Sequence, residues 1–392
     1  MGHYRYLIVG GGMTADAAVR GIREVDPAGS IGLIGSDPHP PYNRPPLTKG
    51  LWKGKAFETI WRHTEETDAD LHLGRTVVAL DPAGRRLHDD GGGDHTFERL
   101  LIATGGTPRR LPFDGERMIY YRTVDDYQRL RALTEEGERF AIIGGGFIGS
   151  EIAAALAMNK KSAALLLQTP GIGARIFPPG LSRYLSGYYA EQGVEVLEGD
   201  AAVGLETEGE RMLLSTKAGR RLRVDGVVAG IGIEPNVGLA QAAGLAVENG
   251  IVTDEFLRTT HPDIFAAGDV AGFTNPALGE VLRVEHEDNA NTMGKVAGRN
   301  MAGATDLYHH LPFFYSDLFD LGYEAVGDLD PRLDVVEDWQ EPYHKGVIYY
   351  LREHRVKGVL LWNVWEQVDH ARQLIGEFGP FRPGDLIGRL PA

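Results

Sequence analysis

The chain has 392 residues, 43% of them apolar, and a formal net charge of −15, which suits a globular protein of two or three domains. The acidic balance argues against a general nucleic-acid binder, which needs a basic face. No apolar run reaches membrane-spanning length, and the first strand begins too early to leave room for a targeting peptide, so we expect a cytoplasmic protein with no membrane partner.

The elements expected along the chain form two βαβ units, each followed by antiparallel strands. A Pro-rich segment over residues 38–49 cannot be regular structure and is predicted to be a rigid loop. The other predicted elements, in order, are a strand over 4–10, a helix over 13–25, a strand over 30–35, an antiparallel element over 71–100, strands over 140–143, 163–167 and 194–197, an antiparallel patch over 201–229, a return to the first domain over 251–268, a helix over 287–301, and a closing antiparallel sheet with a helix over 366–376.

The first glycine-rich turn, Gly10-Gly11-Gly12-Met13-Thr14-Ala15, follows the first strand. Its first glycine permits a tight turn, its second lets the backbone approach a pyrophosphate, and the small third residue lets helix and strand pack closely. The helix N-terminus attracts phosphate through its N–H groups and its dipole. Gly10, Gly12 and Ala15 are therefore predicted to bind a dinucleotide, with Ser36 and Asp37 as candidates for its ribose.

A second glycine-rich turn, Gly144-Gly145-Gly146-Phe147-Ile148-Gly149, repeats the pattern. Gly144, Gly146 and Gly149 take the three roles described above. One such match is weak evidence, but two with correct flanks predict two dinucleotides in one chain, namely a flavin that receives electrons from a nicotinamide. The strand that should end in a ribose-binding acid reads Leu167-Gln168-Thr169-Pro170 instead, so the choice between NADH and NADPH stays open, with Arg175 as a distant phosphate candidate.

No cysteine occurs in the chain. A redox-active disulfide, sulfenate chemistry and a cysteine-ligated iron–sulfur cluster are therefore excluded within it. No metal site is expected either. The redox chemistry must be that of the flavin ring itself.

The sequence resembles the FAD-dependent pyridine nucleotide-disulfide oxidoreductase superfamily, in the branch of the apoptosis-inducing factors and ferredoxin reductases, with the apoptosis-inducing factors as the nearest likeness. The similarity covers nearly the whole chain. It is carried by Pro41-Tyr42-Asn43-Arg44-Pro45-Pro46-Leu47-Thr48-Lys49, the second glycine-rich turn with Ser150-Glu151, Val284-Glu285-His286-Glu287-Asp288, Tyr315-Ser316-Asp317-Leu318, Gly322-Tyr323-Glu324-Ala325-Val326-Gly327 and Leu361-Trp362-Asn363.

The resemblance assigns roles to individual residues. It implies that Lys49 and Glu151 meet beside the flavin N5, where a carboxylate partner keeps the lysine charged; the alternative is a solvated lysine and an ordinary helix-first-turn acid. His286 either contacts the ring or caps the helix that follows it. The remaining residues that the resemblance implies in cofactor binding are Arg44, Thr104, Gly105, Gly268, Asp269, Glu285 and Tyr315.

The expected fold class is α/β, with two interleaved Rossmann-like domains for FAD and NAD(P) and a C-terminal α+β domain with an antiparallel sheet. The expected boundaries are 1–112 and 237–310 for the discontinuous FAD domain, 113–236 for the NAD(P) domain and 311–392 for the C-terminal domain.

The resemblance implies an FAD-dependent NAD(P)H oxidoreductase that transfers a hydride to flavin N5 and passes electrons to an acceptor such as a ferredoxin-type iron–sulfur protein. Lys49, Lys53 and Lys55 are candidates for the docking face. The alternatives are a slow oxidoreductase like the apoptosis-inducing factors, with a stable charge-transfer complex, or a redox-gated interaction protein. A homodimer is left open. The acidic charge gives no support to a cell-death role that needs DNA.

Overall fold

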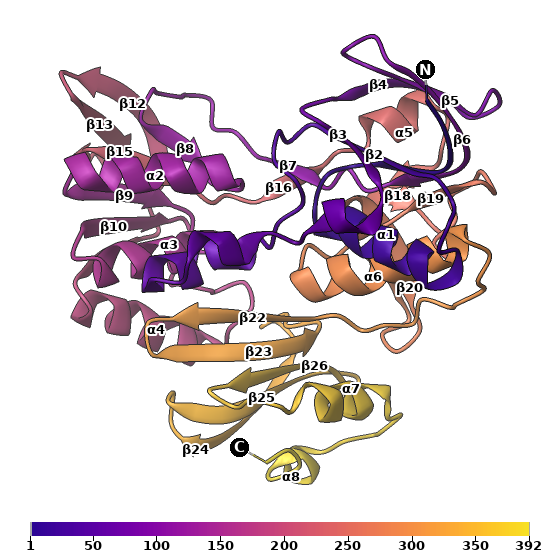
Figure 1. Cartoon of the computed structure of the whole chain (residues 1–392). Helices are drawn as coiled ribbons and strands as arrows, with labels where there is room; N and C mark the ends of the chain where they lie inside the picture. Colours follow the sequence, from indigo (N-terminus) through magenta and orange to yellow (C-terminus); the bar gives the residue numbers. More distant parts are fainter. Residues whose placement is uncertain (1, 392) are drawn as a thin grey trace. The chain divides into compact units, whose positions relative to one another are not determined.

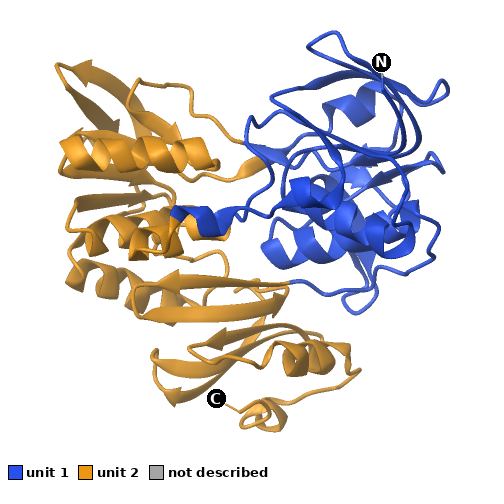
Figure 2. Cartoon of the chain, viewed as in Figure 1, with its two compact units in different colours: residues 1–43, 57–107, 234–312 blue, residues 44–56, 108–233, 313–392 orange. Residues whose placement is uncertain are grey.

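The computed structural model of the chain describes residues 2–391. These residues form two compact units, drawn in different colours in Figure 2. The first unit holds the residues up to 43, 57–107 and 234–312, and the second holds 44–56, 108–233 and the residues from 313 onward. The three-domain division stays a prediction, since the second unit contains both the second Rossmann-like fold and the C-terminal sheet.

The first unit is built on a seven-stranded sheet, most strands of which are labelled in Figure 1. Its parallel strands carry the apolar runs, as expected for strands covered on both faces. A two-strand antiparallel extension completes the sheet. In sheet order the strands are β3 (Asp70–Leu73), β2 (Ile31–Gly35), β1 (Gly2–Val9), β6 (Asp94–Ile102), β5 (Arg86–Asp89) and β4 (Val77–Asp81), with β19 (Ile264–Ala266) paired to β6.

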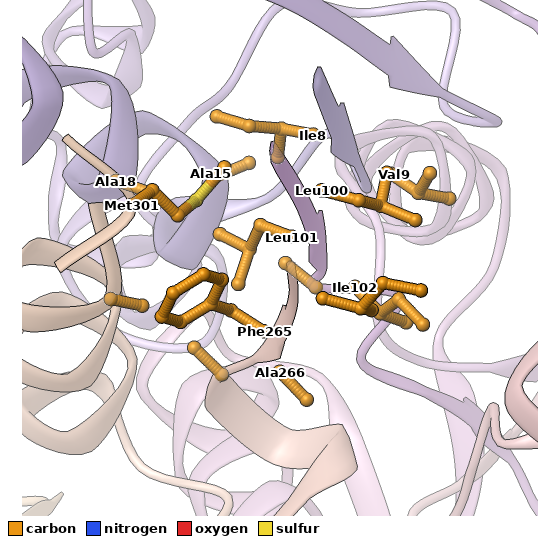
Figure 3. Close-up of a cluster of buried hydrophobic side chains, with 14 of the residues drawn as sticks. Ile8, Val9, Ala15, Ala18, Leu100, Leu101, Ile102, Phe265, Ala266 and Met301 are labelled. Carbon is orange, nitrogen blue, oxygen red and sulfur yellow. The ribbon is translucent and has the colours of Figure 1, made fainter. Parts of the chain in front are cut away.

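Two helices, α1 (Met13–Val25) and α6 (Glu287–Met301), pack against each other and enclose the core of the first unit. Figure 3 shows side chains from α1, β1, β6, β19 and α6 meeting in this core. Because α6 comes from the third segment of the unit, this core contains residues from distant parts of the chain. The remaining elements are α5 (Gly238–Ala242), β17 (Val247–Glu248), β18 (Gly250–Val252), β20 (Ala271–Asn275) and β21 (Glu280–Leu282).

The second unit contains a five-stranded parallel sheet, with α3 (Phe147–Met158) packed against it. Its strands, in sheet order, are β11 (Val194–Glu198), β10 (Ser162–Leu167), β9 (Arg139–Ile143), β15 (Gly226–Ala229) and β8 (Met118–Tyr120). A separate antiparallel sheet holds β12 (Ala202–Glu208), β13 (Arg211–Thr216) and β14 (Arg221–Val224). The other helices are α2 (Val124–Glu136) and α4 (Pro179–Glu191).

The C-terminal part of the second unit is a five-stranded antiparallel sheet with a helix against it. In sheet order its strands are β22 (Phe313–Leu318), β23 (Leu321–Gly327), β26 (Arg355–Trp362), β25 (Lys345–Arg352) and β24 (Asp334–Glu341), followed in the chain by α7 (Val368–Gly376) and α8 (Pro383–Leu386). Two short strands, β7 (Gly106–Pro108) and β16 (Ile233–Pro235), occur where the chain passes from one unit to the other.

The predicted α/β fold class is confirmed, and three local expectations need correction. Residues 226–229 do not continue the antiparallel patch: all four are buried, and they form a parallel strand of the central sheet. Residues 70–73 pair in parallel with β2 and not within the antiparallel element. The Pro-rich segment contains a short 3-10 turn, Pro45–Leu47, because proline fixes the φ angle that such a turn needs.

Among residues 2–391, no helix has the length and apolar character that a membrane span requires.

Candidate active site

The first glycine-rich turn has the geometry of a phosphate-binding turn. Gly10 has φ 135°, and a Cβ at this position would overlap the carbonyl of Ala103, so only glycine fits there. Gly12 is the N-cap of α1 and offers no side-chain cap to the first turn of the helix. Ala15 is completely buried between helix and sheet. The N-terminus of α1 is therefore open to an anionic ligand, as a dinucleotide pyrophosphate requires.

Other predicted cofactor residues lie around this turn. Thr104 and Gly105 directly follow β6, and Asn236 holds them: it accepts a bond from Thr104 Oγ1 through its carbonyl (2.9 Å) and donates to the Thr104 carbonyl through its amide (2.9 Å). A Cβ on Gly268 would collide with Thr14 in the first turn of α1. The structure thus brings the Gly268-Asp269 turn to the same helix end, and a cofactor at α1 fits these residues.

The acid in the loop after β2, Asp37, already has hydrogen-bond partners within that loop. Asp37 accepts bonds from the Tyr42 hydroxyl (2.9 Å) and the His39 backbone N–H (3.0 Å), while Ser36 is exposed. The backbones of Gly11 and Gly35 approach so closely that a Cβ on Gly35 would lie 2.9 Å from the Gly11 Cα. The ribose role of Ser36 and Asp37 stays a prediction.

The N-terminus of α6 begins at His286, which is its N-cap but makes no side-chain capping bond. Glu285 pairs with Arg283 at 2.7 Å, and the same arginine donates to the Asp269 carbonyl oxygen (3.0 Å). Arg283 therefore ties two predicted cofactor residues together. Nothing in the local sequence around it indicated this role.

The second glycine-rich turn is packed in the same way. A Cβ on Gly144 would overlap the carbonyl of Gly230, and one on Gly149 would overlap the carbonyl of Gly144 itself. Gly146, the N-cap of α3, is different, because a Cβ there would meet no atom within 4 Å. Gly144 and Gly149 are therefore required by packing, whereas Gly146 leaves space above the turn for a ligand.

The neighbouring strand β10 ends without a carboxylate. Leu167, its last residue, is 2% exposed and lies against Gly145 of the turn. Gln168 and Arg175 are exposed. The usual carboxylate that binds a ribose hydroxyl at this strand end is thus replaced by a buried leucine.

Lys49 and Glu151 form a buried ion pair within the second unit. The Lys49 Nζ lies 2.7 Å from Glu151 Oε1, and the two side chains are 12% and 3% exposed. The reading of Lys49 as a solvated loop residue is therefore wrong. Two hydroxyls that the sequence did not single out, those of Thr48 (2.5 Å) and Ser316 (2.6 Å), also donate to the Glu151 carboxylate.

Aromatic side chains surround this ion pair. The Tyr315 ring centroid lies 4.9 Å from Lys49 Nζ, a distance that permits a cation–π interaction. Burial, and then the negative charge of Glu151, raises the pKa of both Tyr189 and Tyr323 well above the usual value. The Lys49–Glu151 pair therefore lies among aromatic side chains and is largely shielded from solvent.

Arg44 is the N-cap of the 3-10 turn Pro45–Leu47 and is half-buried in the second unit. Its cofactor role stays a prediction. Within residues 2–391, no group of three or more His, Asp or Glu side chains is arranged to hold a metal ion.

Comparisons with known proteins identify the family of the chain. The family described as pyridine nucleotide-disulphide oxidoreductase matches residues 4–294, and the family described as apoptosis-inducing factor, mitochondrion-associated, C-term matches 297–341 and 335–377. The chain is 32% identical to apoptosis-inducing factor 1, mitochondrial, of Dictyostelium discoideum, over 95% of the chain and 78% of that protein.

Two further relatives are electron-transfer reductases by name. The chain is 34% identical to the 5,5'-dehydrodivanillate O-demethylase ferredoxin reductase subunit of a Sphingobium species, with 83% of the chain and 82% of the relative covered. The solved covalent putidaredoxin reductase–putidaredoxin complex superposes with a TM-score of 0.90 at 29% identity, covering 98% of this chain and 95% of that one. The chain therefore belongs to the pyridine nucleotide-disulphide oxidoreductase family, in its apoptosis-inducing factor and ferredoxin reductase branch, and is an FAD-dependent NAD(P)H oxidoreductase that, having no cysteine, works without a redox disulfide.

Proposed function

We propose that this oxidoreductase passes electrons from NAD(P)H to a ferredoxin-type iron–sulfur protein, and that Lys49 and Glu151 act at the flavin. The observation that carries the proposal is the Lys49–Glu151 pair, a 2.7 Å contact between two nearly buried charges. Burying a charge is costly unless it is paired. A chain that keeps an ammonium group in such a place has a use for its positive charge.

The bound flavin supplies the chemistry, since its N5 accepts a hydride from the nicotinamide. Lys49 then contributes a fixed positive charge that favours the extra electron density on the ring. Glu151 holds the Lys49 ammonium group in place. Tyr315 covers the lysine and restricts the access of water.

The relatives support a ferredoxin-type protein as the class of acceptor. Two of the proteins that the chain resembles over most of its length are named as a ferredoxin reductase subunit and a putidaredoxin reductase. A hydride carries two electrons, and a ferredoxin-type centre accepts one, so two acceptor molecules are reduced for each nicotinamide oxidised. We propose the exposed Lys53 and Lys55 for the docking face; Lys49 does not belong to it, since it is buried in its ion pair.

A slow, sensor-like oxidoreductase is the second candidate. The match of residues 297–377 to the C-terminal family of the apoptosis-inducing factors favours it. The two candidates differ in the fate of the reduced protein, which reacts rapidly with a one-electron acceptor in the first and persists with bound nicotinamide in the second. A homodimer, a cytoplasmic location and the absence of a nucleic-acid partner stay predictions.

The test is anaerobic stopped-flow reduction of the FAD-loaded protein by NADH and by NADPH, followed by mixing with a ferredoxin. We expect fast reduction, reoxidation by two ferredoxins per flavin, and slower reduction in Lys49→Met. Lys161→Met is the control, because Lys161 is also partly buried and paired with a glutamate, Glu138, at 2.9 Å. A long-lived absorbance band that ferredoxin does not remove supports the second candidate. Equal reduction rates in Lys49→Met and wild type contradict the role of the ion pair.

A further inference from the structure

We propose that Thr48 and Ser316 are positioning residues that hold the Glu151 carboxylate in one orientation and thereby hold the Lys49 ammonium group. This inference rests on the proposed role of the ion pair at the flavin. It goes beyond that role, because the two hydroxyls, together with the ion pair, would fix the position of the Glu151 carboxylate.

The carboxylate of Glu151 is almost fully engaged. Its Oε1 accepts from Lys49 Nζ (2.7 Å) and from Ser316 Oγ (2.6 Å), while its Oε2 accepts from Thr48 Oγ1 (2.5 Å). Since both oxygens have partners in fixed places, rotation of the carboxylate breaks at least one short bond. A carboxylate accepts hydrogen bonds and does not donate them, so both hydroxyls act as donors to Glu151.

The two hydroxyls have no competing solvent. Thr48 is 6% exposed and Ser316 is 1% exposed. Thr48 also lies 3.3 Å from the carbonyl of Pro45, but the 2.5 Å contact with Glu151 is the shorter and stronger one. Hydroxyls placed in this way act on Glu151 and not on water.

Ser316 has a buried aromatic neighbour on the adjacent strand. Tyr323 lies opposite Ser316 in the pairing of β22 with β23 and is 2% exposed. The Ser316 hydroxyl therefore donates to Glu151 beside a buried ring and away from bulk water.

The three segments that meet at Glu151 are far apart in the chain. Thr48 and Lys49 follow the 3-10 turn Pro45–Leu47, Glu151 lies in the first turns of α3, and Ser316 lies in β22 of the C-terminal sheet. The C-terminal sheet thus contributes directly to the ion pair. The titratable groups that face the carboxylate are Lys49 from the loop, Tyr189 from α4 and Tyr323 from β23.

The variants are chosen to separate the hydroxyl from the packing. Thr48→Val and Ser316→Ala each remove a donor, whereas Thr48→Ser keeps the donor and loses only a methyl group. Thr134→Val is the matched control, because Thr134 is also 6% exposed and its hydroxyl donates to a carbonyl within α2 (2.7 Å to Arg131 O). All variants are purified with FAD bound.

Two readouts are measured: the anaerobic rate constant of reduction by NADH between about pH 6 and 9, and the midpoint potential of the bound flavin without nicotinamide. We expect Thr48→Val and Ser316→Ala to be reduced about tenfold more slowly at neutral pH. Their potentials shift negative, as in Lys49→Met. Thr48→Ser and Thr134→Val stay within about twofold of wild type.

Each of the other possible results contradicts a specific part of the proposal. Unchanged rates, pH profiles and potentials in Thr48→Val and Ser316→Ala, with a clear effect in Lys49→Met, reject the positioning role and leave the proposed function intact. No effect in Lys49→Met rejects the proposed role of the ion pair at the flavin, on which this inference rests. An equal loss in Thr48→Ser and Thr48→Val shows that packing, and not the hydroxyl, matters. If Ser316→Ala fails to fold, the Thr48 pair decides alone.

Discussion

Two glycines of the second glycine-rich turn offer a sharp test of how it works. A Cβ on Gly149 overlaps the carbonyl of Gly144, whereas a Cβ on Gly146 meets nothing within 4 Å. Gly149→Ala must therefore push α3 away from the turn, while Gly146→Ala fits the free protein. The two substitutions add the same methyl group and should fail in different ways.

The expected magnitudes follow from this difference. Overpacking at Gly149 costs about 1–3 kcal/mol of folding free energy, roughly 2–12 °C in Tm for a domain of this size. Gly146→Ala changes the folding free energy by about 1 kcal/mol or less, since its φ of −88° suits alanine. The Gly146 methyl group instead occupies the space above the turn and removes a hydrogen bond to phosphate, about 1.5–3 kcal/mol, or roughly 10- to 150-fold in the dissociation constant.

The assay is isothermal titration of the oxidised protein with NAD⁺, together with its thermal unfolding. We expect Gly146→Ala to keep its Tm and to lose binding, and Gly149→Ala to lose Tm. If Gly146→Ala binds NAD⁺ as the wild type does, the pyrophosphate does not approach this turn. A wild-type Tm in Gly149→Ala refutes the packing argument.

Two further changes test the nicotinamide site and the electrostatics of the C-terminal sheet. Leu167→Glu places a carboxylate at the end of β10, where it should favour NAD⁺ over NADP⁺. Compared with Leu167→Gln, the ratio of the dissociation constants for NADP⁺ and NAD⁺ should rise by about tenfold or more. An unchanged ratio contradicts this location of the ribose. Asp330→Asn should lower the Tm at neutral pH by an amount that disappears in acid, because the hydrogen bond from Arg332 lowers the pKa of Asp330 from 3.8 to about 2. The stabilisation is present above pH 3.8 and is lost as the pH falls toward 2. It amounts to less than about 1 kcal/mol, since Arg332 is largely exposed, and a difference that persists at the lowest pH contradicts the assignment.

Local patterns explain which parts of this fold were predictable. The turns at Gly10 and Gly144 depend on residues within a few positions of each other, so the sequence alone indicates them. The helix predicted over 287–301 has these same bounds in the structure. Residues 226–229 were misassigned because a buried apolar run does not reveal whether its neighbours run parallel or antiparallel.

The candidate site likewise contains residues that the sequence indicates and residues that it does not. Lys49 and Glu151 lie in motifs that are recognisable from a resemblance, although nothing in the residues between them predicts a 2.7 Å contact. The donors Thr48 and Ser316 were not predicted as site residues, even though both stand next to residues that were. A hydroxyl has no sequence signature of its own, since its role depends on what lies opposite to it in space.

Composition and local spacing determined that the chain binds two dinucleotides and cannot use a disulfide, because missing cysteines and glycine-rich turns are properties of the sequence itself. Only the tertiary structure decided which side chains hold Glu151, that Lys49 is largely shielded from solvent, and that Leu167 is buried against Gly145. The reason is physical: these features depend on contacts between segments up to 165 residues apart, which form only when the C-terminal sheet packs against α3.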